Sequence, residues 1–181
     1  CFASRLLRTK GVLDFIAAAE ILKKRGVKAK FLLAGSIDSQ NQSSLTNPEV
    51  NKIKNDKIVD VLGYVKNIPK LFSKCQIVCL PSYYGEGMPK VLIEAAASGV
   101  AIVTSDIPGC KNTLIPNKTG MLVPIRRPDK LADTLQMLLE NPKKLISMGK
   151  SGREFAEKNF SIERVIHKHL EIYQNLLKNT Y

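Results

Sequence analysis

Short apolar runs alternate with segments of helical period along most of the chain, and this alternation limits the possible folds more than any other feature of the sequence. Strand-length apolar runs that alternate with helices imply parallel strands joined by right-handed helical crossovers. The sequence therefore predicts an α/β fold with a doubly wound parallel sheet of about six strands. The predicted strands cover residues 1–4, 30–35, 57–63, 76–81, 100–104 and 120–123.

The segments between and after these strands carry helix signals. Apolar residues recur at helical spacing over 12–22, and Gly26 follows as a terminator. The next part, residues 36–48, is rich in Ser, Asn and Gln and predicts a mobile surface loop. Further helices are predicted over residues 48–55, 69–75, 89–98, 128–140, 142–159 and 161–178, the last three forming a helical C-terminal tail.

The length of 181 residues suits one domain with a sizeable core. We therefore expect one domain over residues 1–181. The chain begins at Cys1, inside a strand-like run and without an initiator Met. From this we expect that the N-terminal part of a longer protein has been removed.

Neither a membrane span nor a signal peptide is predicted. No apolar run approaches the roughly 18 residues that a transmembrane helix needs. This favours a cytoplasmic location. The four cysteines have no repeated CxxC pairing, and we interpret them as reduced and structural rather than as zinc ligands. They are Cys1, Cys75, Cys79 and Cys110.

The formal net charge of +12 indicates an anionic partner. Nucleic acid is disfavoured, because no interleaving of aromatic and basic residues and no nucleic-acid motif accompanies the charge. A solvated basic surface remains open, and so does attraction to an anionic membrane or a lipid diphosphate. In the second case the protein would lie peripherally at the inner face of the cell membrane.

Five loops follow predicted strands and should gather at one edge of the sheet. In doubly wound folds, ligands bind where the carboxyl ends of strands meet the amino ends of helices. We therefore expect the ligand site to be built from residues 5–10, 35–36, 63–67, 81–88 and 105–110.

The segment over residues 81–99 is the most informative of these. A strand ends at Pro81, and Pro89 suits the first position of a helix whose backbone N–H groups would attract an anion. Gly85 and Gly87 would let the backbone approach a ligand closely. Glu86 enters the same region from the loop, and Glu94 enters it from the second helical turn.

This segment resembles the E-x7-E signature of glycosyltransferase family 4, the retaining transferases of the GT-B architecture. The resemblance extends through residues 86–89 and 94–99. Residues 3–11 resemble a second motif of that family, in which an arginine and a lysine clamp the donor diphosphate, and Arg5 and Lys10 are the counterparts. The similarity covers nearly the whole chain and is greatest to bacterial transferases that build polysaccharides and lipid-linked oligosaccharides.

The resemblance implies that the chain is the Rossmann-like, C-terminal donor-binding half of a GT-B enzyme. Such an enzyme transfers a sugar, with retained configuration, from a nucleotide sugar, here a uridine diphosphate (UDP) sugar, to an acceptor hydroxyl. The acceptor, a glycan or a polyprenyl-diphosphate-linked sugar, would belong to an absent N-terminal domain. The terminal helix over 160–181 would pack back toward that domain, and the isolated chain would be inactive.

The resemblance also assigns roles to individual residues. Glu86 would lie beside the donor sugar and act with Arg5 and Lys10 in catalysis. Glu94 would bind the ribose hydroxyls, since a carboxylate can accept two hydrogen bonds. No cofactor or metal is implied, because two cations can offset the charge on the leaving diphosphate. The remaining expected contacts are Gly63, Tyr64 and Val65 at the base and Gly87, Met88 and Pro89 at the sugar and diphosphate.

Two residues depart from the relatives, which often carry an acidic residue where Asn112 stands and a basic one where Gly85 stands. These departures would change either the choice of sugar or a local ion pair. Arg8 is expected to be merely solvent-exposed. His167 and His169 face different sides of a predicted helix, which suits a surface or packing role better than metal binding.

Two other functions stay open. An epimerase of the same architecture would act on the nucleotide sugar without an acceptor, although it would need a histidine near the sugar. A non-catalytic nucleotide-binding module would bind the diphosphate without any glycosyl chemistry. The leucine stripe of the tail, by contrast, predicts only core packing: Leu131, Leu135, Leu138 and Leu139.

Overall fold

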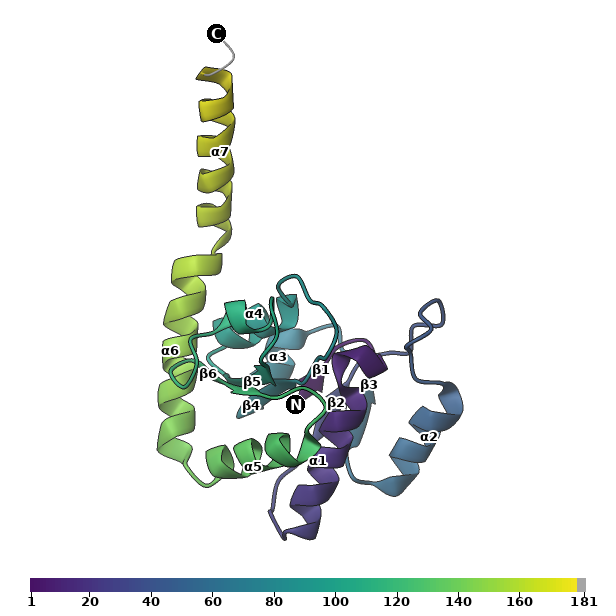
Figure 1. Ribbon diagram of the computed structural model, residues 1–181. Coiled ribbons are helices and arrows are strands. Elements are labelled where there is room, and N and C mark those ends of the chain that lie inside the picture. Colours follow the sequence, from purple (N-terminus) through teal and green to yellow (C-terminus); the bar gives the residue numbers. More distant parts are fainter. Residues whose placement is uncertain (179–181) are drawn as a thin grey trace.

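A computed structural model describes residues 1–178, and it confirms the predicted alternation of strands and helices (Figure 1). The strands are β1 (Phe2–Ala3), β2 (Leu32–Ala34), β3 (Asp60–Gly63), β4 (Ile77–Leu80), β5 (Ala101–Ser105) and β6 (Gly120–Val123). The helices are α1 (Val12–Lys24), α2 (Asn47–Asp56), α3 (Ile68–Phe72), α4 (Lys90–Ala97), α5 (Pro128–Leu139), α6 (Pro142–Phe160) and α7 (Ile162–Lys178). Two short 3-10 turns, η1 (Arg8–Lys10) and η2 (Lys111–Thr113), were not predicted.

The strands form two three-stranded parallel ladders, β1-β2-β3 and β4-β5-β6. Backbone hydrogen bonds join the ladders: the Cys1 amine donates to the Ile77 carbonyl over 2.7 Å, and the Cys79 N–H donates to the Cys1 carbonyl over 2.8 Å. The strands therefore lie in the order β3-β2-β1-β4-β5-β6. This is the doubly wound order, and its reversal point between β1 and β4 is where such folds bind ligands.

The central strands are buried on both faces. Every residue of β4 and β5 is buried, as expected for parallel strands that helices cover from two sides. Figure 1 shows α1 and α5 on one face of the sheet and α3 and α4 on the other. The leucine stripe of α5 packs into the core as predicted, with Leu131, Leu135 and Leu138 all buried.

Several predicted boundaries differ from those observed. The strand predicted over 57–63 is shorter because α2 continues to Asp56 and Lys57 then adopts a left-handed conformation with φ of 50°. Pro89 precedes α4 as its N-cap and is not the first helical residue. The helix α2 begins with a capping box, in which the Glu49 carboxylate accepts from both the Thr46 N–H and the Thr46 hydroxyl at 2.8 Å.

The four cysteines are free thiols, as predicted. Cys79 and Cys110 are buried, and burial raises the pKa of Cys79 to about 12. A thiol so far from its thiolate form is a packing residue and a poor metal ligand. Within residues 1–178 no group of three or more His, Cys, Asp or Glu side chains could hold a metal ion.

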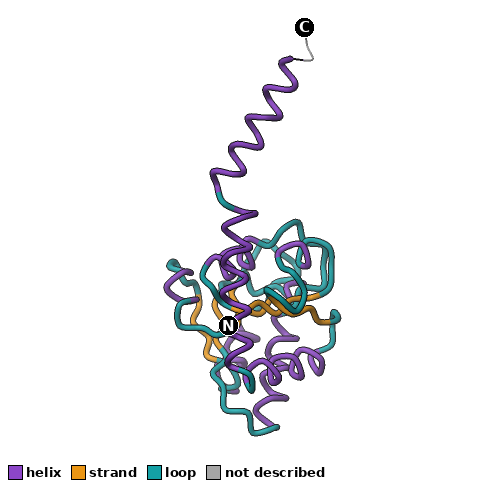
Figure 2. Tube along the Cα trace, turned by 90° about the vertical axis from the view of Figure 1, so that its left-hand side faces the viewer, coloured by secondary structure: helices purple, strands orange, loops and turns teal. Residues whose placement is uncertain are grey.

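The last helix, α7, projects away from the rest of the molecule (Figures 1 and 2). His167 and His169 are exposed on it, in agreement with the predicted surface role, and His167 lies 3.2 Å from the Glu171 carboxylate. In the described part of the chain no helix is both long enough and apolar enough to span a membrane. Exposed apolar side chains recur on one side of α7: Ile162, Val165, Ile166, Leu170, Tyr173, Leu176 and Leu177.

Candidate functional site

The loops that follow β1, β2, β3 and β4 converge at the carboxyl edge of the sheet, as predicted. Hydrogen bonds connect them directly: the Tyr83 N–H donates to the Thr9 carbonyl at 3.0 Å, and the Gly35 N–H donates to the Gly63 carbonyl at 2.8 Å. Cys110 is close enough to Lys10 and Glu86 for both charges to act on its thiol, whose pKa burial raises. The loop after β5 therefore joins the same cluster.

A cavity of about 290 Å³ opens between these loops. It brings together four of the predicted site residues, namely Arg5, Tyr64, Val65 and Glu94. It is about the size of a small ligand pocket, and it lies at the reversal point of the sheet. Its other lining residues are Ala3, Ser4, Ala34, Gly35, Ser36, Lys66, Ile68 and Val91.

Glu94 reaches the cavity from the second turn of α4, as its spacing from Pro89 predicts. Its side chain is one-third exposed and lies 3.5 Å from the Lys90 ammonium, an i,i+4 pair on the same helix. Because that pair is weak and the carboxylate reaches solvent, Glu94 can accept hydrogen bonds from a ligand at little cost.

Lys10 and Glu86 form a tight ion pair between the loops after β1 and β4, and neither residue lines this cavity. The Lys10 ammonium donates to both carboxylate oxygens of Glu86 at 2.6 Å, and the Ser82 hydroxyl donates to one of them at 2.8 Å. The two side chains are only 20% and 11% exposed. The pair therefore fixes the loop after β4 to the loop after β1, and Glu86 is held from two sides.

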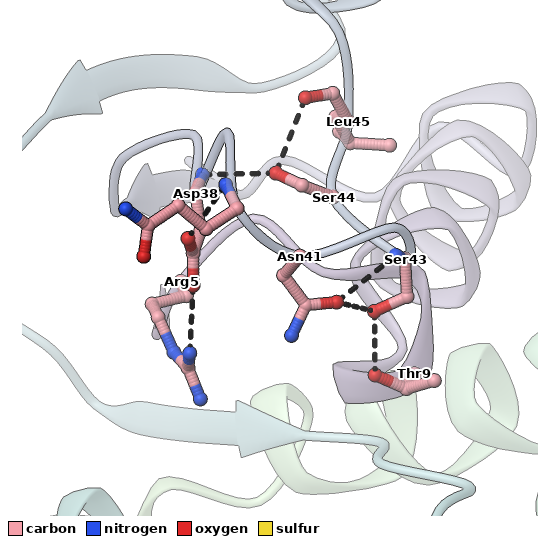
Figure 3. Close-up of polar contacts among 8 residues, drawn as sticks. Arg5, Thr9, Asp38, Asn41, Ser43, Ser44 and Leu45 are labelled. Atoms are coloured by element: carbon pink, nitrogen blue, oxygen red, sulfur yellow. Dashed lines mark hydrogen bonds and ion pairs between the residues drawn. The ribbon is translucent and has the colours of Figure 1, made fainter.

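Arg5 is the more accessible of the two predicted diphosphate ligands. Its side chain is 56% exposed, and one guanidinium nitrogen donates to the Asp38 carboxylate at 2.7 Å (Figure 3). The prediction that Arg8 is merely solvent-exposed is wrong. Its guanidinium donates to the Ser44 carbonyl at 2.6 Å and to the Glu49 carboxylate at 2.5 Å, so Arg8 ties the loop after β1 to α2.

Four predicted ligand contacts do not line this cavity: Gly63, Gly87, Met88 and Pro89. Tyr64 is 77% exposed and Met88 is 52% exposed. Gly87 is also exposed, whereas Pro89 is buried. Gly63 ends β3 in the left-handed region with φ of 68°. This conformation turns the backbone and so determines where Tyr64 and Val65 lie.

Two polar residues of the site were missed by sequence reasoning. Asp38 lies in the segment predicted as a mobile loop, and Ser82 is the second residue after the end of β4. No motif marks either residue. Their partners, Arg5 and Glu86, could have pointed to them, since a half-buried charge needs a partner.

A cation–π contact also supports the loop after β4. The Arg126 guanidinium lies 4.5 Å from the centre of the Tyr83 ring, and Arg126 adopts a left-handed conformation with φ of 53°. Burial raises the pKa of Asp14 on α1, and the charge of Arg126 acts in the opposite direction. Arg126 therefore connects the start of α5 to the site through a cation–π contact.

A larger cavity, of about 410 Å³, lies at the opposite edge of the sheet. Three lysines line it, Lys28, Lys30 and Lys74, together with apolar side chains of α1 and α5. It is remote from the loops at the carboxyl ends of the strands, and so from every predicted site residue.

Comparison with known proteins agrees with this arrangement. A family model described as glycosyl transferases group 1 matches residues 1–155. A transferase of Campylobacter jejuni, N,N'-diacetylbacillosaminyl-diphospho-undecaprenol alpha-1,3-N-acetylgalactosaminyltransferase, is 31% identical over 178 residues, which are 97% of this chain and 44% of that protein.

Solved structures share the fold. A glycosyltransferase from Rickettsia africae superposes with a TM-score of 0.85 at 23% identity, covering 98% of this chain and 47% of its own. The Anabaena protein HepE, solved in complex with UDP and glucose, superposes with a TM-score of 0.83 at 20% identity over 96% of this chain and 47% of its own. The chain thus spans less than half the length of these proteins.

Proposed function

The chain belongs to the glycosyl transferases group 1 family, and we propose that it is the donor-binding half of a retaining glycosyltransferase that takes its sugar from a UDP-sugar. The observation that carries this proposal is the cavity at the carboxyl edge of the sheet, which both Arg5 and Glu94 line. A carboxylate and a guanidinium at one opening suit a ligand with ribose hydroxyls at one end and a diphosphate at the other.

UDP is the nucleotide that the comparisons favour, because HepE was solved in complex with UDP. In the proposed complex Glu94 binds the ribose. The base lies along Gly63, Tyr64 and Val65, and the diphosphate lies against Arg5. Gly87, Met88 and Pro89 line the sugar and diphosphate.

The proposed reaction breaks the bond between the anomeric carbon and the diphosphate oxygen and forms one between that carbon and the acceptor oxygen on the same face. The acceptor proton passes to the leaving phosphate. Arg5 and Lys10 stabilise the charge that develops on the diphosphate. Glu86, fixed by Lys10 and Ser82, lies beside the donor sugar, where a carboxylate can stabilise positive charge at the anomeric centre.

The acceptor is assigned by analogy alone. The Campylobacter relative is named for a sugar carried on undecaprenyl diphosphate, so a glycan or a polyprenyl-diphosphate-linked sugar is proposed here. The surplus of lysine and arginine, +12 in formal charge, suits a peripheral location at an anionic membrane surface that carries such lipids.

A second domain is proposed to hold this acceptor. The relatives are more than twice as long as this chain, and α7 projects from the domain with exposed apolar side chains such as Ile162, Ile166 and Tyr173. An amphipathic helix of this kind needs a surface to cover its apolar stripe. We assign that role to an N-terminal acceptor-binding domain, against which α7 would pack.

Replacing Glu94 with Ala should weaken the binding of UDP by about 1–3 kcal/mol, the usual cost of losing hydrogen bonds to a charged group. Uridine should lose a similar amount, because the ribose is common to both ligands. Calorimetric titration measures both affinities. Glu20→Ala is the matched control, since Glu20 forms the same i,i+4 pair with a lysine on α1; equal affinities for wild type and Glu94→Ala would remove the ribose assignment.

Replacing Arg5 with Ala should weaken UDP binding by about 1–2 kcal/mol at low salt, because a charge-assisted contact of a half-exposed side chain is lost. The affinity should also depend less on salt, whereas the affinity for uridine should hardly change. Titration at two salt concentrations gives the result, with Arg25→Ala, which removes a similar half-exposed pair with Asp133, as control. A parallel loss for uridine and UDP would show that Arg5 does not contact the diphosphate.

A further inference from the structure

The segment between β2 and α2 is attached along its length to the loop that carries Arg5. The Leu6 N–H donates to the Ser36 carbonyl at 3.0 Å, the Arg8 N–H donates to the Ser43 carbonyl at 2.7 Å, and the Leu45 N–H donates to the Leu6 carbonyl at 2.8 Å. The segment over 36–48, predicted from composition as a mobile surface loop, is therefore hydrogen-bonded to the loop after β1. Backbone that is hydrogen-bonded at both ends can hold a side chain in a fixed place.

Asn41 and Ser43 add a side-chain anchor to this attachment (Figure 3). The Asn41 side-chain oxygen accepts from the Ser43 N–H at 2.9 Å and from the Ser43 hydroxyl at 2.8 Å. The Ser43 hydroxyl lies 3.2 Å from that of Thr9, within η1. The segment is thus fixed to the same turn that carries Lys10.

Asp38 is the fixed member of its pair with Arg5. Its N–H donates to the hydroxyl of the buried Ser44 at 2.9 Å, and its carbonyl accepts from the Asn41 N–H at 3.0 Å. One carboxylate oxygen accepts from the Gln40 N–H at 3.3 Å, and the other faces Arg5. Its side chain is 25% exposed against 56% for Arg5. Asp38 therefore sets the position of the arginine.

We propose that Asp38 is a positioning residue for Arg5, holding its guanidinium at the mouth of the cavity in readiness for the donor diphosphate. This inference rests on the proposed function and adds a residue to it. The pair uses one donor of a guanidinium that has five, so the others are left to contact a phosphate. A free arginine would lose much side-chain entropy on binding, and Asp38 removes part of that loss in advance.

The opposite effect, competition between Asp38 and the diphosphate for Arg5, would work against binding. Solvent screens a half-exposed pair strongly, so the repulsion between the Asp38 carboxylate and a phosphate is small. The contact that fixes the guanidinium is a direct hydrogen bond of 2.7 Å to a carboxylate that is only 25% exposed, so salt weakens it less. Positioning should therefore exceed repulsion at physiological ionic strength.

The test compares UDP and uridine affinities of the 181-residue chain and its variants by calorimetry. Asp38→Ala should weaken UDP binding by roughly fivefold, about the net worth of one ordinary hydrogen bond, and leave uridine within twofold. Asp38→Asn should lose less, because its amide oxygen still accepts from Arg5. Asp133→Ala, which breaks the pair with Arg25 at the other end of α1, should have no effect.

A double-mutant cycle separates positioning from a structural role of the loop. In an Arg5→Ala background, Asp38→Ala should cause no further loss. Three results would each overturn the proposal: an equal loss of affinity in the wild-type and Arg5→Ala backgrounds, an unchanged affinity of Asp38→Ala for UDP, or tighter binding of UDP by Asp38→Ala. If Asp38→Ala does not fold, Asp38→Asn is used for the same cycle. Absence of UDP binding to the wild-type chain would instead remove the proposed function.

Discussion

The 181-residue chain, expressed on its own, is expected to bind UDP and to form no product in a sugar-transfer assay. The proposed donor contacts lie within residues 5–94 and are local to this domain. The acceptor, in contrast, would be neither positioned nor shielded from water. Orientation of two reactants contributes about 7–11 kcal/mol to a well-arranged reaction, and without that contribution transfer would be too slow to detect.

A radiolabelled transfer assay and NMR titration with UDP measure the two parts of this result. Chemical-shift changes should concentrate at Arg5, Lys10, residues 63–65 and residues 86–94. The control is the same chain joined to the N-terminal half of a group 1 relative. Robust turnover by the 181-residue chain, or shift changes confined to another surface, would contradict the proposed division of roles; an epimerised nucleotide sugar formed without acceptor would indicate an epimerase.

Replacing Gly11 with Ala is expected to destabilise the fold by about 2–5 kcal/mol. Gly11 lies between Lys10 and α1 with φ of 77°, and a Cβ there would come within 2.0 Å of the Pro81 carbonyl oxygen. The left-handed conformation alone costs an alanine about 1–2 kcal/mol. The clash with backbone adds about 1–3 kcal/mol, as overpacking of a fixed core does.

Gly26→Ala is a matched control for that variant. Gly26 has nearly the same φ, 76°, at the other end of α1, but no atom lies within 4 Å of its added Cβ. In denaturant unfolding, Gly26→Ala should lower the free energy of unfolding by the conformational cost alone. Gly11→Ala should lower it further, because only this variant also has the clash with Pro81. Equal free energies of unfolding for the two variants would mean that the contact with Pro81 is not tight.

Residues whose role depends on local pattern were predicted well from the sequence. The strands β4 and β5 could be predicted from their own residues alone, because strands buried on both faces are continuously apolar. Glu94 was placed correctly because a helix fixes the direction of each residue relative to its start. The roles of Arg5, Lys10 and Glu86 come from the family motifs and stay predictions.

Residues whose role depends on distant partners were not predicted. Asp38 lies 33 positions from Arg5 in a segment whose composition indicates only a loop, and Arg8 was judged exposed because its partner Glu49 lies 41 positions away. The start of α2 was misplaced by one residue although Thr46 and Glu49 form a capping box. The composition of a segment predicts that it is a loop, but it does not reveal the long-range contacts that fix the loop in the fold.

The adjacency of β1 and β4 also affects how the domain folds. Lys10 and Glu86 are 76 positions apart in the chain, so the site has a high contact order and closes only after the slow, entropically costly union of the two ladders. A partly folded chain with only β1, β2 and β3 in place holds no complete site. If UDP binds as proposed, we therefore expect it to bind the fully assembled state and to raise the free energy of global unfolding, not that of one ladder.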